Sequence, residues 1–107
     1  MTLRSRNESK INRFRALNNF LQNKYIILVF IGHKNQIDQT STVIDVVDEF
    51  KIGSRYAYKL LEELESGRFI IKKAKVLKHG IYYSNYIITE TAKSELREIL
   101  KIITSIL

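Results

Sequence analysis

The apolar pattern of this sequence changes its period at Gly67, and this change restricts the fold more than any other feature. Before Gly67, apolar residues recur at the three- and four-residue steps of a buried helix face: Ala57, Leu60, Leu61 and Leu64. After Gly67, the segment RFIIKKAKVLKHGIYYSNYIIT is rich in β-branched and aromatic residues, which favour strands. The sequence therefore predicts a mainly helical α+β fold in which a helix leads directly into a β-structure.

The β-type segment is divided by the dipeptide His79-Gly80. A tight hairpin turn takes a residue that tolerates positive φ followed by glycine, and this dipeptide supplies both. We expect a two-stranded antiparallel hairpin, with strands from about Phe69 to Leu77 and from Ile81 to Ile88. His79 is accordingly interpreted as a turn residue rather than a ligand.

Two short helical patterns precede the hairpin. The first has Ser41 or Thr42 as its N-cap and apolar residues at helical spacing: Val43, Ile44, Val47 and Phe50. The second begins at Ser54, which we expect to be its N-cap. Because a short turn containing Gly53 joins the two patterns, they predict a helix-turn-helix.

Longer helical patterns flank this central part. One begins near residue 11 and continues to Gly32; its portion YIILVFI could also be a strand, but helix is favoured because the spacing continues. The other is capped by Thr89 or Thr91 and runs to the C-terminus. Its apolar surface exceeds what one small domain can cover, which predicts a homodimer. The last helix would form the dimer interface, either alone or together with the first helix. The dimerisation residues would be Leu96, Ile99, Leu100, Ile103, Ile106 and Leu107.

Positive charge is concentrated in two blocks. The net charge is +7 at pH 7, with five basic side chains and one acidic side chain in residues 1–15. Residues 68–80 hold five more basic side chains and no acidic one. Two such patches on an otherwise slightly acidic chain are typical of a protein that binds a polyanion. The alternative is that this charge only keeps the protein soluble.

The sequence excludes several classes of function. It contains no cysteine, its two histidines stand far apart, and it has no glycine-rich phosphate loop or paired acid and histidine. We therefore expect no enzyme activity, no cofactor and no metal. The longest apolar run has seven residues, where a membrane span needs about 20, so a soluble, cytoplasmic protein is expected. Residues 1–10 are interpreted as a basic arm and 11–107 as one domain, with the last helix over about 89–107.

The order helix, helix-turn-helix, basic hairpin, helix is that of a winged helix-turn-helix domain. The sequence also resembles PadR-like and MarR-like regulators in YKLLEELESGRFI, through Tyr58, Leu61, Leu64, Glu65, Gly67 and Ile70. The segment YIITETAKSEL resembles the end of the wing and the start of the last helix in the same group. Small archaeal or plasmid-borne winged-helix proteins are equally similar. Gly67 comes one residue early and Ala92 replaces a usual glycine, which leaves the subfamily open.

The resemblance implies binding of double-stranded DNA. With the leucines of the second short helix inward, Arg55 and Lys59 point together to the opposite side, where Arg can read guanine. The recognition helix, residues 54–65, would lie in the major groove, and the hairpin, residues 69–88, would follow the backbone or enter the minor groove. The candidate DNA contacts are Ser54, Arg55, Tyr56, Tyr58 and Lys59 in the recognition helix, Lys72, Lys73, Lys75 and Lys78 in the hairpin, and Arg4 and Arg6 in the arm. Alternatively these are solvated residues, with Lys59 pairing with Glu63 and the tyrosines packing in the core.

Three functions fit these features. The first is a dimeric, sequence-specific transcriptional regulator, associated with the nucleoid. The second is a partition-type or architectural protein, which spreads along DNA and, in the partition case, has a protein partner. The third is a winged helix that binds only proteins. A bounded footprint on DNA, a spreading footprint, and the absence of salt-dependent DNA binding distinguish the three.

Overall fold

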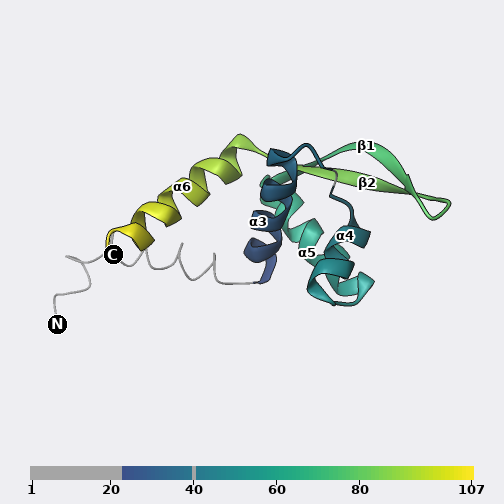
Figure 1. The fold of residues 1–107 in the computed structure, drawn as a ribbon, viewed down its shortest axis with the longest axis horizontal. Coiled ribbons are helices and arrows are strands. Elements are labelled where there is room, and N and C mark those ends of the chain that lie inside the picture. Colours follow the sequence, from purple (N-terminus) through teal and green to yellow (C-terminus); the bar gives the residue numbers. More distant parts are fainter. Residues whose placement is uncertain (1–22, 40) are drawn as a thin grey trace.

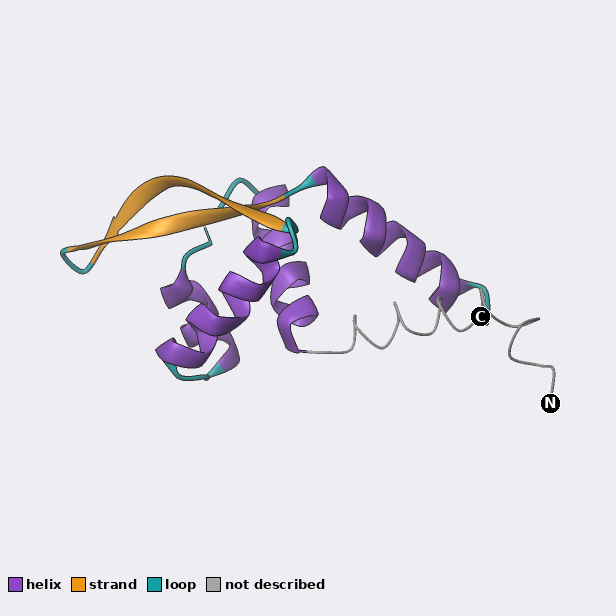
Figure 2. Ribbon diagram, turned by 180° about the vertical axis from the view of Figure 1, so that it is seen from behind, coloured by secondary structure: helices purple, strands orange, loops and turns teal. Residues whose placement is uncertain are grey.

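A computed structural model describes residues 23–39 and 41–107. The elements follow in the order α3 (Asn23–Gln36), α4 (Val43–Phe50), α5 (Ser54–Ser66), β1 (Ile70–Lys78), β2 (Ile81–Ile88) and α6 (Glu90–Thr104). Helices α3, α4 and α5 form the body, from which the β1–β2 hairpin and α6 extend in opposite directions (Figure 1, Figure 2). This arrangement confirms the predicted α+β winged helix-turn-helix. We call the hairpin, residues 70–88, the wing.

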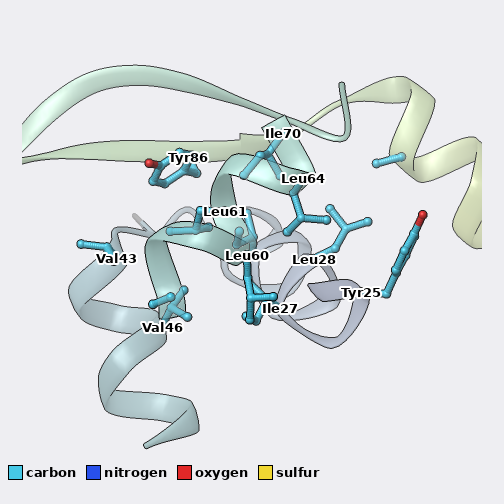
Figure 3. Close-up of a cluster of buried hydrophobic side chains, with 13 residues drawn as sticks. Tyr25, Ile27, Leu28, Val43, Val46, Leu60, Leu61, Leu64, Ile70 and Tyr86 are labelled. Carbon is cyan, nitrogen blue, oxygen red and sulfur yellow. The ribbon is translucent and has the colours of Figure 1, made fainter. Parts of the chain in front are cut away.

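The core lies where α3, α5 and the base of the wing meet (Figure 3). Leu28 of α3 and Leu61 and Leu64 of α5 are almost completely buried, and Ile70 covers them from the first strand. Full burial of each such side chain contributes about 1.5–3 kcal/mol relative to leaving it in water. These contacts fix the orientation of α5, and thereby of its outer face.

The end of α3 corrects the sequence prediction, because this helix does not stop at Gly32 but continues to Gln36. A Cβ at Gly32 would lie 3.1 Å from Cδ1 of Ile88, so glycine lets α3 pack closely against β2. In the next turn of the helix, the side-chain oxygen of Asn35 accepts a hydrogen bond from the backbone N–H of Ile88, at 2.9 Å. Gly32 thus allows α3 and β2 to approach closely and does not end the helix. The segment YIILVFI is helical as expected. The part predicted before residue 23 lies outside the described residues.

The two short helices begin differently. Thr42, one of the two proposed N-caps, accepts from the backbone N–H of Asp45, whose carboxylate accepts from the backbone N–H of Thr42 in return. The prediction of Ser54 as the second N-cap is wrong. Gly53 takes that position without a side-chain hydrogen bond, and Ser54 is the first helical residue. Lys51 ends α4 with a left-handed backbone conformation, so the chain has already turned when it reaches Gly53. The next helix therefore begins at Ser54, with Gly53 as its N-cap.

The hairpin turn is as predicted, since His79 and Gly80 have φ of 52° and 78°. The second strand has the expected bounds. The first strand spans Ile70–Lys78 rather than Phe69–Leu77, a shift of one residue. Arg68 causes the shift because its φ of 62° makes the turn after α5, so the extended backbone begins later.

The last helix is capped by Thr89, one of the two candidates, whose hydroxyl oxygen accepts from the N–H of Ala92 at 3.2 Å. The same hydroxyl donates to the backbone oxygen of Arg68 at 2.7 Å, which joins the start of α6 to the end of α5. Helix α6 then leads away from the body (Figure 1). Over residues 23–39 and 41–107, we find no helix with the length and apolar character needed to cross a membrane.

Candidate nucleic-acid interface

The outer face of α5 carries two cations near its N-terminus. Its inner face is buried as predicted, through Ala57, Leu60, Leu61 and Leu64, whereas Arg55 and Lys59 are exposed. The alternative pairing of Lys59 with Glu63 does not form, and within the described residues neither cation makes an ion pair. Arg55 and Lys59 are four residues apart, so both project from one side of the helix. They present two uncompensated charges to solvent.

The remaining predicted residues of α5 differ in their surroundings. Ser54 is exposed in the first turn. Tyr56 is partly exposed and lines a small apolar pocket with Phe50 and Ile52 of the preceding turn. Tyr58 is exposed. Tyr86 of the wing lies over Leu61 of the same helix (Figure 3). The outer face of α5 therefore combines cations with partly apolar rings.

Acidic side chains occupy the second half of α5. Glu62 and Glu63 are exposed, and Glu65 is half-buried beside the wing. Burial is the main cause that raises the pKa of Tyr86, and the negative charges of Glu65 and Glu62 raise it further. The two ends of α5 therefore differ in charge, and only its N-terminal half suits an approaching polyanion.

The four predicted lysines of the wing fall into two classes. Lys72 lies 3.8 Å from Glu65 of α5, and Lys78 lies 2.6 Å from Asp45 of α4. Lys73 and Lys75 are exposed and, within the part of the chain that the structure describes, form no ion pair. Lys78 joins the wing to α4 and Lys72 lies beside Glu65, which leaves Lys73 and Lys75 as the wing lysines without an ion pair among the described residues.

A β-bulge separates the two unpaired lysines. Lys73 is paired with Asn85 and Lys75 with Ser84, so Ala74 is an extra residue in the first strand. Consecutive residues of a strand point to opposite faces of the hairpin, so Ser84 and Asn85 point to opposite faces. Lys75 and Lys73, which pair with them, therefore also point to opposite faces. Without the bulge both lysines would share one face. The wing thus carries an unpaired cation on each side.

Asp45 is a junction between the helix-turn-helix and the wing that sequence analysis missed. One carboxylate oxygen accepts from Nζ of Lys78 at 2.6 Å, and the other accepts from the backbone N–H of Thr42 at 2.8 Å. Partial burial alone would raise the pKa of Asp45, but its hydrogen bonds to Lys78 and Thr42 together with the charge of Lys78 hold it below its usual value. The spacing Thr-x-x-Asp signals the capping box, but nothing local signals the lysine.

Backbone contacts at Ser41 reinforce this junction. The N–H of Ser41 donates to the side-chain oxygen of Asn85 at 2.8 Å, and its carbonyl accepts from the N–H of Tyr86 at 2.8 Å. Together with the Asp45–Lys78 pair, these bonds fix the wing against the start of α4. We call this set of contacts, made by Ser41, Asp45, Lys78, Asn85 and Tyr86, the wing clamp.

The last helix ends at Thr104 and does not run to the C-terminus as predicted, so four of the predicted dimerisation residues lie on α6 and two, Ile106 and Leu107, follow it. Leu100, Ile106 and Leu107 are exposed, Leu96 and Ile103 are half-buried, and Ile99 is already buried in the single chain. The predicted arm contacts Arg4 and Arg6 lie outside the described residues. Among the described residues, no group of three acidic or histidine side chains is arranged to hold a metal ion.

A solved structure shares this fold. The crystal structure of the adhesin competence repressor, AdcR, from Streptococcus pyogenes superposes with a TM-score of 0.58 over 98% of this chain and 75% of that chain, at 18% sequence identity. No family model matches the sequence, and no curated protein matches it either. The order and packing of the described elements and this likeness agree that the chain has the winged helix-turn-helix fold of such regulators.

Proposed function

We propose that this protein is a transcriptional regulator that binds a specific sequence of double-stranded DNA as a dimer. The observation that carries the proposal is that Arg55 and Lys59, on the N-terminal half of α5, are exposed and make no ion pair with any described residue. In helix-turn-helix proteins this half of the recognition helix meets base edges in the major groove. Arg55 has the geometry to bind O6 and N7 of guanine, and Lys59 reaches a base or phosphate. The fold it shares with a repressor supports the same role.

The wing supplies phosphate contacts in this proposal. Lys73 and Lys75 are the lysines available for it, because Lys72 and Lys78 already lie beside Glu65 and Asp45. Phosphate contacts position a protein on the duplex without reading its sequence. We therefore assign sequence preference to α5 and part of the salt-dependent affinity to the wing.

Dimerisation is proposed through α6. Leu100 of α6 and, just after its end, Ile106 and Leu107 are exposed, and α6 extends away from the body (Figure 2). A two-fold axis along this helix would cover these side chains and present two copies of α5 to half-sites about one helical turn apart. Leu100→Asp should then give monomers in sedimentation, whereas Arg97→Asp, at another exposed position of α6, should leave the dimer intact. An unchanged dimer in Leu100→Asp would place the interface elsewhere.

The decisive experiment is selection of bound duplexes from a random library, followed by footprinting and a salt titration. A regulator should select one bounded site, with affinity that falls steeply as salt rises. Protection that spreads along the DNA with protein concentration would support the partition-type or architectural role instead. Lack of affinity for any duplex at about 50 mM salt would refute both and leave a protein-binding winged helix.

A further inference from the structure

The end of the wing is apolar. Leu77, Ile81 and Tyr82 are 57%, 55% and 65% exposed, and they lie directly beside the turn. Leu77 and Tyr82 are partners across the two strands, so their side chains lie together on one face. Burying a side chain of this size contributes about 1.5–3 kcal/mol. The wing tip, defined as these three residues, therefore holds apolar surface that a binding partner can use.

The charges around the wing tip indicate what kind of partner fits. The sequence contains no acidic residue from 66 to 89, and Lys73 and Lys75, which are exposed and form no ion pair within residues 23–39 and 41–107, lie on the strand that leads to the tip. Lys78, beside the turn, is directed to Asp45 and not outward. The result is an apolar end within a positively charged hairpin. The minor groove of DNA is complementary to it, since phosphates line its edges and base pairs form its floor.

The wing tip is narrow and held in place. Its turn has only two residues, His79 and Gly80, both in the left-handed region, and the minor groove is about 6 Å wide. The wing clamp, through the 2.6 Å pair of Lys78 and Asp45, fixes the hairpin to the helix-turn-helix. A hairpin fixed in this way reaches the same duplex that α5 binds, which favours DNA over an acidic protein or a membrane surface.

We infer that the wing tip is an apolar wedge that enters the minor groove and bends the DNA beside the site read by α5. This inference rests on the proposed function and adds to it a deformation of the duplex. Apolar side chains placed between base pairs unstack them and kink DNA by about 20–90°. Pyrimidine–purine steps unstack most easily, so such a step should recur at a fixed distance from the site of Arg55.

The test measures the bend of the duplex that the wild-type protein selects from a random library. Energy transfer between dyes at the two ends reports the bend, and 2-aminopurine beside the expected step reports unstacking. Wild-type protein should bend the duplex and raise the 2-aminopurine fluorescence. The double variant Leu77→Ser/Tyr82→Ser should lose both signals and bind about tenfold or more weakly, equivalent to about 1.4 kcal/mol.

Two control variants separate the wedge from general effects. Ile71→Ser removes an apolar side chain that is 43% exposed at the base of the same wing, and it should leave the bend unchanged. Leu77→Met keeps the apolar volume and should keep the bend. Thermal unfolding should show the same stability for all these variants, because every substituted side chain is exposed.

Each other outcome has a definite meaning. A straight duplex with wild-type protein, or a bend that survives in the double variant, would overturn the wedge while leaving DNA binding in place. No binding of any duplex would instead refute the proposed function. If the double variant lost affinity for phosphatidylglycerol vesicles while still bending DNA like wild type, the wing tip would be a membrane-contacting surface and the inference would be wrong.

Discussion

Helix α5 and the wing both carry exposed cations, but the cations of the two elements differ in their partners. The two cations of α5, Arg55 and Lys59, make no ion pair within the described residues, whereas Lys72 and Lys78 of the wing are paired with acids of the helices. The reason lies in how each element is held. Helix α5 is fixed by buried leucines and can leave its cations exposed, whereas a two-stranded hairpin has little core of its own. In the proposed function, the cations of α5 bind DNA, whereas those of the wing are divided between attachment to the helices and binding of DNA.

The largest expected effect on DNA binding comes from Arg55 of α5, and it tests whether this helix reads the DNA sequence. Arg55→Ala should weaken binding of the selected duplex by about 1–3 kcal/mol and relax the preference at one base pair, because a bidentate contact to guanine is lost. Binding to a library of single-base variants by fluorescence anisotropy measures both effects. Glu62→Ala, at an exposed position on the acidic half of the same helix, is the matched control and should not relax the preference.

Uniform weakening across all sequences in Arg55→Ala would contradict this assignment. In that case Arg55 would contact only phosphate, and the distinction between α5 as reader and the wing as anchor would fail.

A smaller effect is expected from the unpaired lysines of the wing. Lys73→Ala and Lys75→Ala should each weaken binding by about 1 kcal/mol at 0.1 M salt, and each should reduce the slope of log affinity against log salt by about 0.9. The preferred sequence should stay the same, since phosphates carry no sequence information. Lys72→Ala is the comparison, because Lys72 lies near Glu65 and should change the slope less.

Equal slopes for Lys72→Ala, Lys73→Ala and Lys75→Ala would show that the contact to Glu65 does not withdraw Lys72 from DNA. Lys72 and Glu65 are both partly exposed, and an ion pair between exposed side chains contributes little free energy, so DNA phosphates can compete with Glu65 for Lys72.

The parts of the fold that follow from local chemistry could be predicted from the sequence. The buried stripe of α5 repeats at helical spacing, and His79-Gly80 matches the conformational demand of a tight turn. The cap of α4 is also a local signal, which the sequence narrowed to Ser41 or Thr42 and which the structure assigns to Thr42. Each of these depends on residues within a few positions of one another, which is why spacing alone was sufficient.

One error is local, since Gly53 and not Ser54 is the N-cap of α5, and another arose where distant residues meet. Gly32 was interpreted as a helix end, but its lack of a side chain serves the approach of Ile88, 56 positions later. The pairing of Lys78 with Asp45, 33 positions earlier, was also not anticipated, while the DNA contact proposed for Lys78 stays a prediction. No periodicity connects such pairs, so the wing clamp and the division of the wing lysines became visible only with the tertiary structure.

The smallest effect is expected from the wing clamp, which connects the two regions. Asp45→Asn should lower the free energy of unfolding by about 1 kcal/mol, because it loses the charge that binds Lys78 while keeping an acceptor for Thr42. Chemical denaturation at pH 7 measures this loss. Asp48→Asn, an exposed acid on the same helix, should change stability little.

The pH dependence distinguishes the ion pair from a change in packing. Burial opposes ionisation of Asp45, but its hydrogen bonds and the charge of Lys78 outweigh burial and lower its pKa in the folded protein. The stability that this carboxylate contributes is therefore fully present above its unfolded pKa of about 3.9. It is lost as pH falls through the pKa of the folded state. Wild-type protein should therefore lose an increment of stability below about pH 4 that Asp45→Asn lacks.

DNA affinity at neutral pH should fall less in Asp45→Asn than in Arg55→Ala, because a loosened wing still leaves α5 held by its core. If the clamp variant lost more affinity than Arg55→Ala, wing placement would dominate binding, and the roles assigned to the two regions would have to be exchanged.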